Sequence, residues 1–272
     1  MQSKESYSAE FTLDQTLPTS YSPEKGICVM HDVKKSRLTE WLLLCGVIGP
    51  VLFWVVLLLE SVTRPSFNMW QTQGSYLALT NQGWEQITNF IVFGLLSMLY
   101  AAGLRRTFST GRASVWGPLL VGLFGLGMVG LGVFVTDPGD GYPPGTPLHT
   151  SPTTWHGVTH GLTGLVTVNL VLTAMCFVFS RRFLADPRYR RWGTYAWLTG
   201  ALIIAISVPG TVGLPFAYQS GFPVIDGLIQ RITITMGWTW MALTAWMLWR
   251  EAHKGEGEVD AASGTLSEAR AG

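Results

Sequence analysis

Six long apolar segments restrict what this chain can fold into. Each is about 20 residues long and contains at most one Asp, Glu, Lys or Arg. They cover residues 41–59, 87–104, 115–135, 158–179, 195–214 and 228–249. A helix of about 20 apolar residues crosses the hydrocarbon core of a bilayer, and it satisfies its own backbone hydrogen bonds there. The sequence therefore predicts an all-α fold, a polytopic membrane helix bundle with six transmembrane helices.

Basic residues alternate between the connections of these segments. Lys and Arg lie just before the first segment, between the second and third, between the fourth and fifth, and after the sixth. The other connections, residues 60–86, 136–157 and 215–227, contain Arg64 as their only basic residue. Because Lys and Arg are enriched in cytoplasmic loops, the pattern predicts a multi-pass protein of the cell membrane with both termini in the cytoplasm.

The two ends of the chain differ in composition from its middle. Residues 1–38 and 251–272 are polar, and we expect both to be disordered cytoplasmic segments that flank a membrane domain at 39–250. Charged residues make up 13% of the chain, against about a quarter in soluble domains. The net charge of +1 comes without a dense basic cluster, so we expect no nucleic-acid partner. The sequence contains no phosphate-binding glycine loop, nucleophile elbow or CxxC pair.

Ionisable side chains cluster at the non-cytoplasmic entrance of the fourth segment. Three of the five histidines lie there, His149, His156 and His160, and Asp137 closes the third segment at a similar depth. His156 and His160 are four residues apart and share one face of a helix. All four residues together could bind a divalent metal such as zinc. Without a metal, Asp137, His156 and His160 could perform acid/base catalysis, or the histidines could simply hydrogen-bond at the interface.

Arg231 is the only Lys or Arg well inside a segment. A buried arginine is costly without a partner, so we expect Asp137 or Glu60 to pair with it. Such a pair could lock two helices together, or the arginine could recognise a substrate. Amide side chains occur at the same depth and could line a pocket beside it. The candidate substrate-binding residues are Asn89, Gln86, Gln230 and Arg231.

Several stretches of this sequence resemble one family. Residues 134–147 (FVTDPGDGYPPGTP) and 155–161 (WHGVTHG) carry the resemblance, supported by 75–79 (SYLAL), 83–90 (GWEQITNF) and 227–231 (GLIQR). They resemble the DUF998 family of bacterial integral membrane proteins over about residues 40–249. The resemblance implies a six-helix membrane protein of undefined function. It also favours Asp137, His156 and His160, but not His149, as site residues.

Three classes of function remain open at this point. The protein could be a membrane-embedded enzyme that cyclises, isomerises or hydrolyses a hydrophobic substrate by acid/base or metal-assisted chemistry. It could instead be a transporter or export protein, or a noncatalytic membrane subunit or sensor. In each case we expect membrane lipids and a hydrophobic small molecule as partners. The sequence leaves open whether the chain is an enzyme at all and which cofactor it would use.

Overall fold

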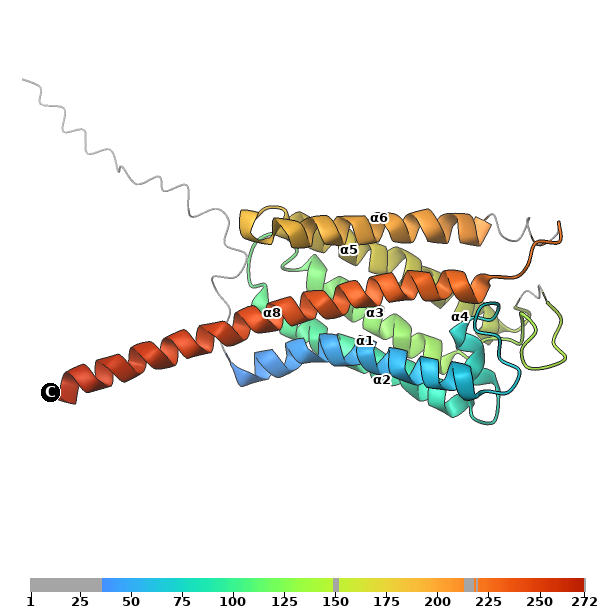
Figure 1. Ribbon diagram of the computed structural model, residues 1–272, viewed down its shortest axis with the longest axis horizontal. Helices are drawn as coiled ribbons and strands as arrows, with labels where there is room; N and C mark the ends of the chain where they lie inside the picture. The colour runs from blue at the N-terminus through green and yellow to red at the C-terminus, as the bar shows by residue number, and fades with distance from the viewer. Residues whose placement is uncertain (1–35, 149–151, 213–217, 219, 272) are drawn as a thin grey trace, which may run out of the picture.

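The computed structural model describes residues 36–148, 152–212, 218 and 220–271, with the backbone alone at 211, 212 and 254–271. Within these ranges the chain is helical and forms no β-sheet (Figure 1). The membrane-crossing helices are α1 (Arg37–Thr63), α2 (Gly83–Thr107), α3 (Trp116–Val133), the run of α4 (Trp155–Gly164), η3 (Leu165–Val171) and α5 (Leu172–Phe183), α6 (Arg190–Val212) and α8 (Asp226–Ala271). Two short 3-10 helices, η2 (Gly74–Leu79) and η4 (Pro187–Tyr189), lie in connections.

The six predicted segments fall on these helices, which confirms the all-α membrane bundle. Five spans are long and apolar enough to cross a membrane: α1, α2, α3, the α4–η3–α5 run, and α6 with η4. The sixth helix, α8, packs along α1 and α6 in the same bundle. Between residues 232 and 249 it contains four Trp and four Thr, which lower its hydropathy without adding charge.

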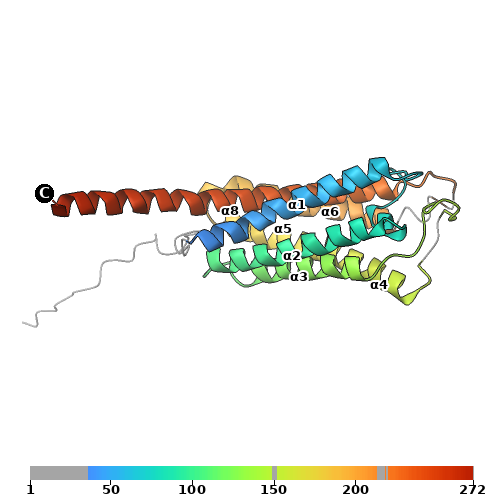
Figure 2. The ribbon, with the colours of Figure 1, turned by 90° about the horizontal axis from the view of Figure 1, so that it is seen from below.

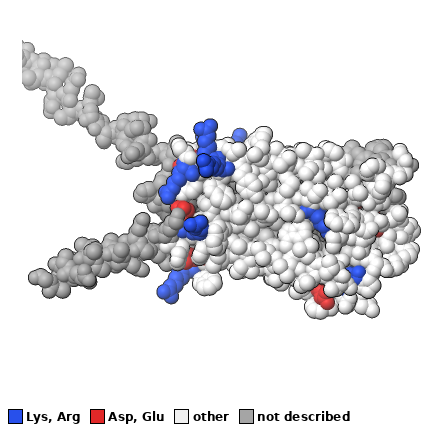
Figure 3. Space-filling model, in the orientation of Figure 1, with Lys and Arg blue, Asp and Glu red and all other residues white. Residues whose placement is uncertain are grey.

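The bundle has two chemically different ends. Lys and Arg gather at the end where α1 begins and where α8 leaves the bundle (Figure 3). We call this the basic end, and the opposite end, where α1 ends and α2, α4 and α8 begin, the far end. Among the described basic residues, only Arg64 and Arg231 belong to the far end. The alternation of basic and non-basic connections along the sequence thus corresponds to a separation of Lys and Arg toward one end of the bundle.

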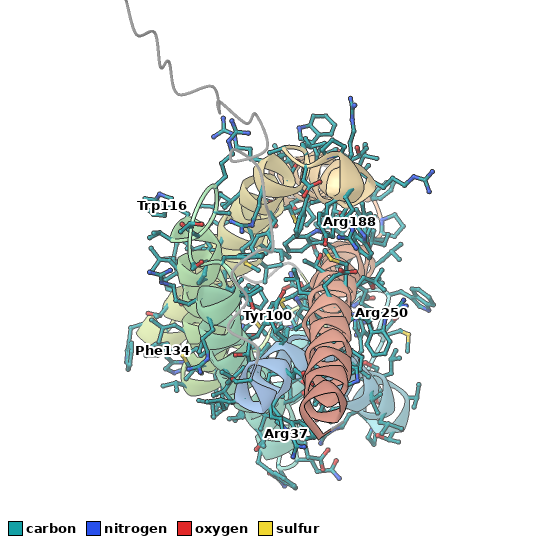
Figure 4. The ribbon with its side chains drawn as sticks, turned by 90° about the vertical axis from the view of Figure 1, so that its left-hand side faces the viewer. Arg37, Tyr100, Trp116, Phe134, Arg188 and Arg250 are labelled. Atoms are coloured by element: carbon teal, nitrogen blue, oxygen red, sulfur yellow. The ribbon has the colours of Figure 1, made fainter. Side chains whose placement is uncertain are left out.

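Glycine allows α2 and α3 to pack with their backbones in contact. A Cβ atom added to Gly94 would strike the carbonyl oxygen of Gly125, and a Cβ atom on Gly125 would strike the carbonyl of Gly94. The two helices therefore lie along each other (Figure 2). Seen from the basic end, Tyr100 points into the bundle core while Trp116 projects outward (Figure 4).

The fourth span crosses the bundle obliquely and changes its helical geometry on the way. Its α5 part packs extensively on α6, its η3 part only slightly, and its α4 part packs on α3 instead. Residues Leu165–Val171 form a π-helix between the two α-helical parts. Such segments are rare and occur frequently at functional sites.

At the ends of the chain, the helices are longer than the predicted membrane domain. Helix α1 begins at Arg37, where the Ser36 hydroxyl accepts a hydrogen bond from the Thr39 amide. The backbone of α8 continues as a helix to Ala271, whereas the sequence predicts disorder for residues 251–272. That stretch is rich in Ala and Glu, which favour helix formation. The predicted disorder of residues 1–35 lies outside the described residues.

Candidate functional site

A cavity of about 580 Å³ lies in the far half of the bundle, and all six spans contribute to its wall. This volume falls within the range of about 300–1,000 Å³ that is usual for small-molecule sites. The wall is mostly apolar, with a limited number of polar side chains. It therefore has the general composition of a binding site for a small organic molecule.

Four polar side chains surround the cavity at nearly the same depth. We call them the polar ring: Gln86, His160, Ser207 and Gln230. They lie three to five residues from the far ends of α2, α4, α6 and α8, respectively. At about 1.5 Å of rise per residue, this places them about 5–8 Å below those helix ends.

Aromatic side chains close the cavity toward the middle of the bundle. Phe53 and Trp238 line its deep end, with ring centroids 4.4 Å apart. Phe93 packs against both rings, at 5.3 Å from Phe53 and 5.0 Å from Trp238. We call these three rings the aromatic floor. Trp238 is twelve residues into α8, so the floor lies about 18 Å from the far end.

Three polar atoms on the cavity wall lack a hydrogen-bond partner among the described residues. They are Nε2 of Gln86, Oγ of Ser207 and Nε1 of Trp238. All three side chains are more than nine-tenths buried. The amide and indole nitrogens can only donate, and the hydroxyl can donate or accept. A buried donor without a partner costs about 1–3 kcal/mol. Each of the three atoms exposes less than 1 Å², so an acceptor oxygen in the cavity would relieve that cost after a small rotation of the side chain.

Hydrogen bonds to neighbouring residues hold the two glutamines of the polar ring. The amide of Asn89 donates to Oε1 of Gln86 and to the carbonyl oxygen of Phe53, both at 3.2 Å. Oε1 of Gln230 accepts from the Gly74 amide at 2.8 Å. Asn89 is not part of the cavity wall. Of the predicted substrate-binding residues, Gln86 and Gln230 therefore line the cavity, and Asn89 positions Gln86.

Asp137 lies at the start of α4, outside the cavity wall. Its Oδ2 accepts from the backbone amides of Thr153 and Thr154 at 2.7 and 2.8 Å. Its Oδ1 accepts from the Thr154 hydroxyl at 2.5 Å. These bonds, the one from the Thr154 hydroxyl first, hold the pKa of Asp137 below its usual range. A Cβ atom on Gly157 would strike the carboxylate. The hydroxyl of Thr154 accepts from the Gly157 amide and caps α4. Asp137 therefore holds the capping residue in place, and its predicted catalytic role stays a prediction.

The two histidines of α4 make the same type of contact but occupy different places. Nδ1 of His156 lies 3.0 Å from the carbonyl oxygen of Val135, and Nδ1 of His160 lies 2.6 Å from that of Phe134. A carbonyl only accepts, so Nδ1 donates in both rings. The His156 side chain is half-exposed and lies 3.8 Å from Oδ1 of Asp137. His160 is buried and lines the cavity, which His156 does not.

Arg231 is buried but does not line the cavity. Its guanidinium donates to the carbonyl oxygens of Thr72 and Gly227 at 3.0 and 3.1 Å, and to the Ser61 hydroxyl at 3.2 Å. The prediction that Asp137 or Glu60 pairs with Arg231 is wrong, because its partners among the described residues are carbonyl and hydroxyl oxygens. Backbone carbonyls of the 64–73 connection and α8 engage its terminal nitrogens instead, while Nε has no partner among the described residues. Arg231 therefore fastens that connection to α8.

Glu60, one of the two partners predicted for Arg231, pairs with a different arginine. Its Oε1 lies 2.9 Å from Nη2 of Arg64, which also lies 3.1 Å from Oε2 of Glu85. Arg64 further donates to the side chain and the carbonyl oxygen of Gln82. Both far-end arginines are thus engaged outside the cavity, and neither is in its wall.

The predicted metal site is only partly within the described residues. His149 lies outside them. Within them, no group of three His, Cys, Asp or Glu side chains is placed to hold a metal ion. Both oxygens of Asp137 accept hydrogen bonds, and one ring nitrogen of each of His156 and His160 donates to a carbonyl. The described side chains therefore fit hydrogen bonding at the start of α4 better than metal ligation. The metal site that includes His149 stays a prediction.

Sequence reasoning missed several residues of the site. Ser207 and Trp238 lie inside apolar segments, where both residue types are common enough to give no warning. The π-helix, which places Val168 and Asn169 in the wall, has no recognised sequence pattern here. A usable signal was the presence of helical glycines that line the cavity, Gly161, Gly164 and Gly210.

Comparison with known families gives one match. The family model described as "Protein of unknown function (DUF998)" matches residues 47–247, which contain most of the spans and the whole described cavity wall. The comparisons with curated proteins and with solved structures gave no match. The family match covers well over half of the chain and agrees with the helical membrane architecture. The chain belongs to the DUF998 family of proteins of unknown function.

Proposed function

We propose that this protein binds a hydrophobic small molecule with a polar group in the cavity of its far half. The observation that carries the proposal is the union, in one cavity, of an apolar wall and unpartnered buried donors. An apolar body would fill the deep part above the aromatic floor. An oxygen on the same molecule would accept from Gln86 or Ser207 of the polar ring, or from Trp238 of the floor.

The proposed orientation places the cavity on the non-cytoplasmic side of a bacterial cell membrane. The support is the gathering of arginines at the basic end, because such residues are retained in the cytoplasm. Single cysteines at Leu148 and at Ser109 mark opposite ends. In intact cells, a membrane-impermeant maleimide should label Leu148→Cys and leave Ser109→Cys unlabelled until the cells are opened. The reverse pattern would refute the orientation.

Enzymatic acid/base chemistry on a hydrophobic substrate is a second candidate, because the imidazole of His160 lines the cavity. Asp137 and His156 would then act by holding α4, and thus His160, in place. A transport pathway has less support, since the aromatic floor closes the cavity toward the basic end. A noncatalytic sensor would use the same binding site without a reaction.

The test is to identify what the purified protein carries. Ile234 lines the cavity and is buried, so Ile234→Trp fills the space. Leu243, on the same helix, is 42% exposed and outside the wall, so Leu243→Trp is the matched control. Mass spectrometry of detergent-purified protein should find a molecule enriched over bulk lipid in the wild type and in Leu243→Trp, but not in Ile234→Trp. Equal extracts from all three proteins would contradict the proposal.

A further inference from the structure

We infer that the cavity takes an uncharged, lipid-soluble molecule, which enters sideways from the bilayer past Gly161. This rests on the proposed function and adds the chemical class of the ligand and its route. Two independent sets of observations support it, one on charge and one on space.

The charges around the cavity disfavour an anionic headgroup. No Lys or Arg is part of the described wall, and residues 149–151 and 213–217 contain none. Arg64 and Arg231, the two described cations of the far end, lie outside the wall and donate through their terminal nitrogens to groups elsewhere. Asp226, a carboxylate, lines the mouth. An anion would therefore lose its hydration and meet negative charge.

The polar ring itself suits an uncharged group. It consists of two amides, a hydroxyl and an imidazole whose Nδ1 is already used by a carbonyl. Such groups donate to carbonyl, ether or hydroxyl oxygens without introducing a net charge. Asp226, the carboxylate of the wall, begins α8 and lies above the ring, where the Tyr218 hydroxyl bonds to it. A cationic head would have to stop at that level and leave the ring unsatisfied.

Part of the cavity wall faces lipid. Val158, Leu162 and Leu165 line the cavity, yet they are 44%, 59% and 40% exposed. A side chain that is both exposed and in the wall marks an opening. Because α4 diverges from α6 toward the far end, and because Ser207 and Gly210 of α6 are also in the wall, the opening lies between these two helices.

Gly161 stands at this opening without a packing reason. A Cβ atom added to it would meet nothing within 4 Å, whereas at Gly94 or Gly125 it would strike a facing backbone. Glycine destabilises a helix interior relative to alanine. Close helix packing explains Gly94 and Gly125 but not Gly161. We therefore attribute the glycine at position 161 to the open space that the absence of a side chain leaves beside the helix.

The experiment uses the full chain in lipid vesicles and three photoactivatable probes with the same sixteen-carbon diazirine chain. Their heads are an alcohol, a phosphate and a trimethylammonium group. The alcohol should label cavity-wall peptides about tenfold or more above the other two, because tenfold corresponds to a modest difference in binding free energy. Equal labelling by the phosphate or ammonium probe would overturn the uncharged class.

The route is tested by the rate of labelling after the alcohol is added to the vesicles. Gly161→Trp should slow labelling of the wall by about tenfold and reach the wild-type level on long incubation. Val166→Trp is the matched control, since Val166 is 45% exposed on the same span and outside the wall. Wild-type kinetics in Gly161→Trp would overturn the lateral route.

Failure of the proposed function gives a different result. If no probe labels the wall of the wild-type protein, or if Ile234→Trp labels like the wild type, the cavity is not a binding site and the inference falls with it. Gel filtration and the thermal midpoint of each variant establish that it is folded before labelling is scored.

Discussion

The basic half and the far half of this bundle are built on the same helices but packed differently. In the basic half, Tyr100, Phe179 and Phe183 are almost fully buried, and Gly46 leaves just enough room for the Tyr100 ring. In the far half, the same helices separate around a cavity. Unpartnered polar atoms also occur in the basic half, for example at Ser180 and Thr244. What distinguishes the far half is therefore the cavity, whose wall includes residues that carry such atoms.

With the proposed function, this difference separates stability from binding along one axis. Close packing in the basic half leaves no room for a ligand, while the far half gives up contacts that its helices could make with each other. Sites for small molecules need such a compromise, because a wall that is fully satisfied by the protein has nothing left to offer a ligand. The predictions below test how sharply the two functions are divided.

The largest effect is expected where two backbones touch. Gly125→Leu should lower the free energy of unfolding by about 3 kcal/mol or more, because the Gly94 backbone cannot move aside. Gly161→Leu should change it by less than about 1 kcal/mol, since leucine favours helix and meets no atom there. Unfolding by sodium dodecyl sulfate in mixed micelles measures both. Similar losses for the two variants would break the comparison.

Asp137→Ala should cost about 2 kcal/mol of unfolding free energy, because it removes the acceptor of three hydrogen bonds at the start of α4. Asp186→Ala is the matched control at the basic end: Asp186 accepts one backbone N–H, from Arg188 at 2.9 Å, and its loss should be under about 1 kcal/mol. If Asp137 only holds the capping residue in place, the folded Asp137→Ala protein keeps its ligand. Loss of the ligand at unchanged stability would favour a role in chemistry.

The pH dependence of stability follows from the same carboxylate. Its pKa is lower in the folded protein than in the unfolded chain, so its contribution is present above the ordinary aspartate pKa of about 4 and is lost as pH falls through the folded value. Acidification below about pH 4 should therefore destabilise the wild type more than Asp137→Asn, in micelle unfolding at matched ionic strength. Parallel curves would mean that the hydrogen bonds to Asp137 do not favour the charged form.

The smallest change in stability, with the opposite sign, is expected at Gln86. Gln86→Leu removes a buried donor that has no partner, together with one acceptor of the Asn89 amide. Because that amide keeps its bond to the Phe53 carbonyl, the free energy of unfolding should still rise, by up to about 1 kcal/mol. Binding of the alcohol probe should weaken in the same variant. Asn89→Leu is the control, because it removes the bond to the Phe53 carbonyl and should destabilise. A Gln86→Leu protein that is both less stable and fully able to bind would place the site elsewhere.

The sequence was informative where a rule of membrane physics applies to single residues. Long apolar segments and alternating arginines predicted the six helices and the charge separation of the bundle. Gln86, Gln230 and His160 were found because polar groups in spans are costly. The partner of Arg231 was not predictable, since loop carbonyls can replace a carboxylate and their position depends on the folded connection. Asp137 and His156 were grouped with His160 by depth, but depth says nothing about which side of α4 faces the cavity.

The aromatic floor has a consequence for the electrical state of the membrane. If water reaches the polar ring, most of the voltage drop falls across the tightly packed half beneath Phe53, Phe93 and Trp238. One elementary charge that crosses 100 mV gains about 2.3 kcal/mol, but an occupant of the cavity would feel little of that field. The protein could then load and release its ligand in energised and de-energised cells alike, without providing a leak for protons.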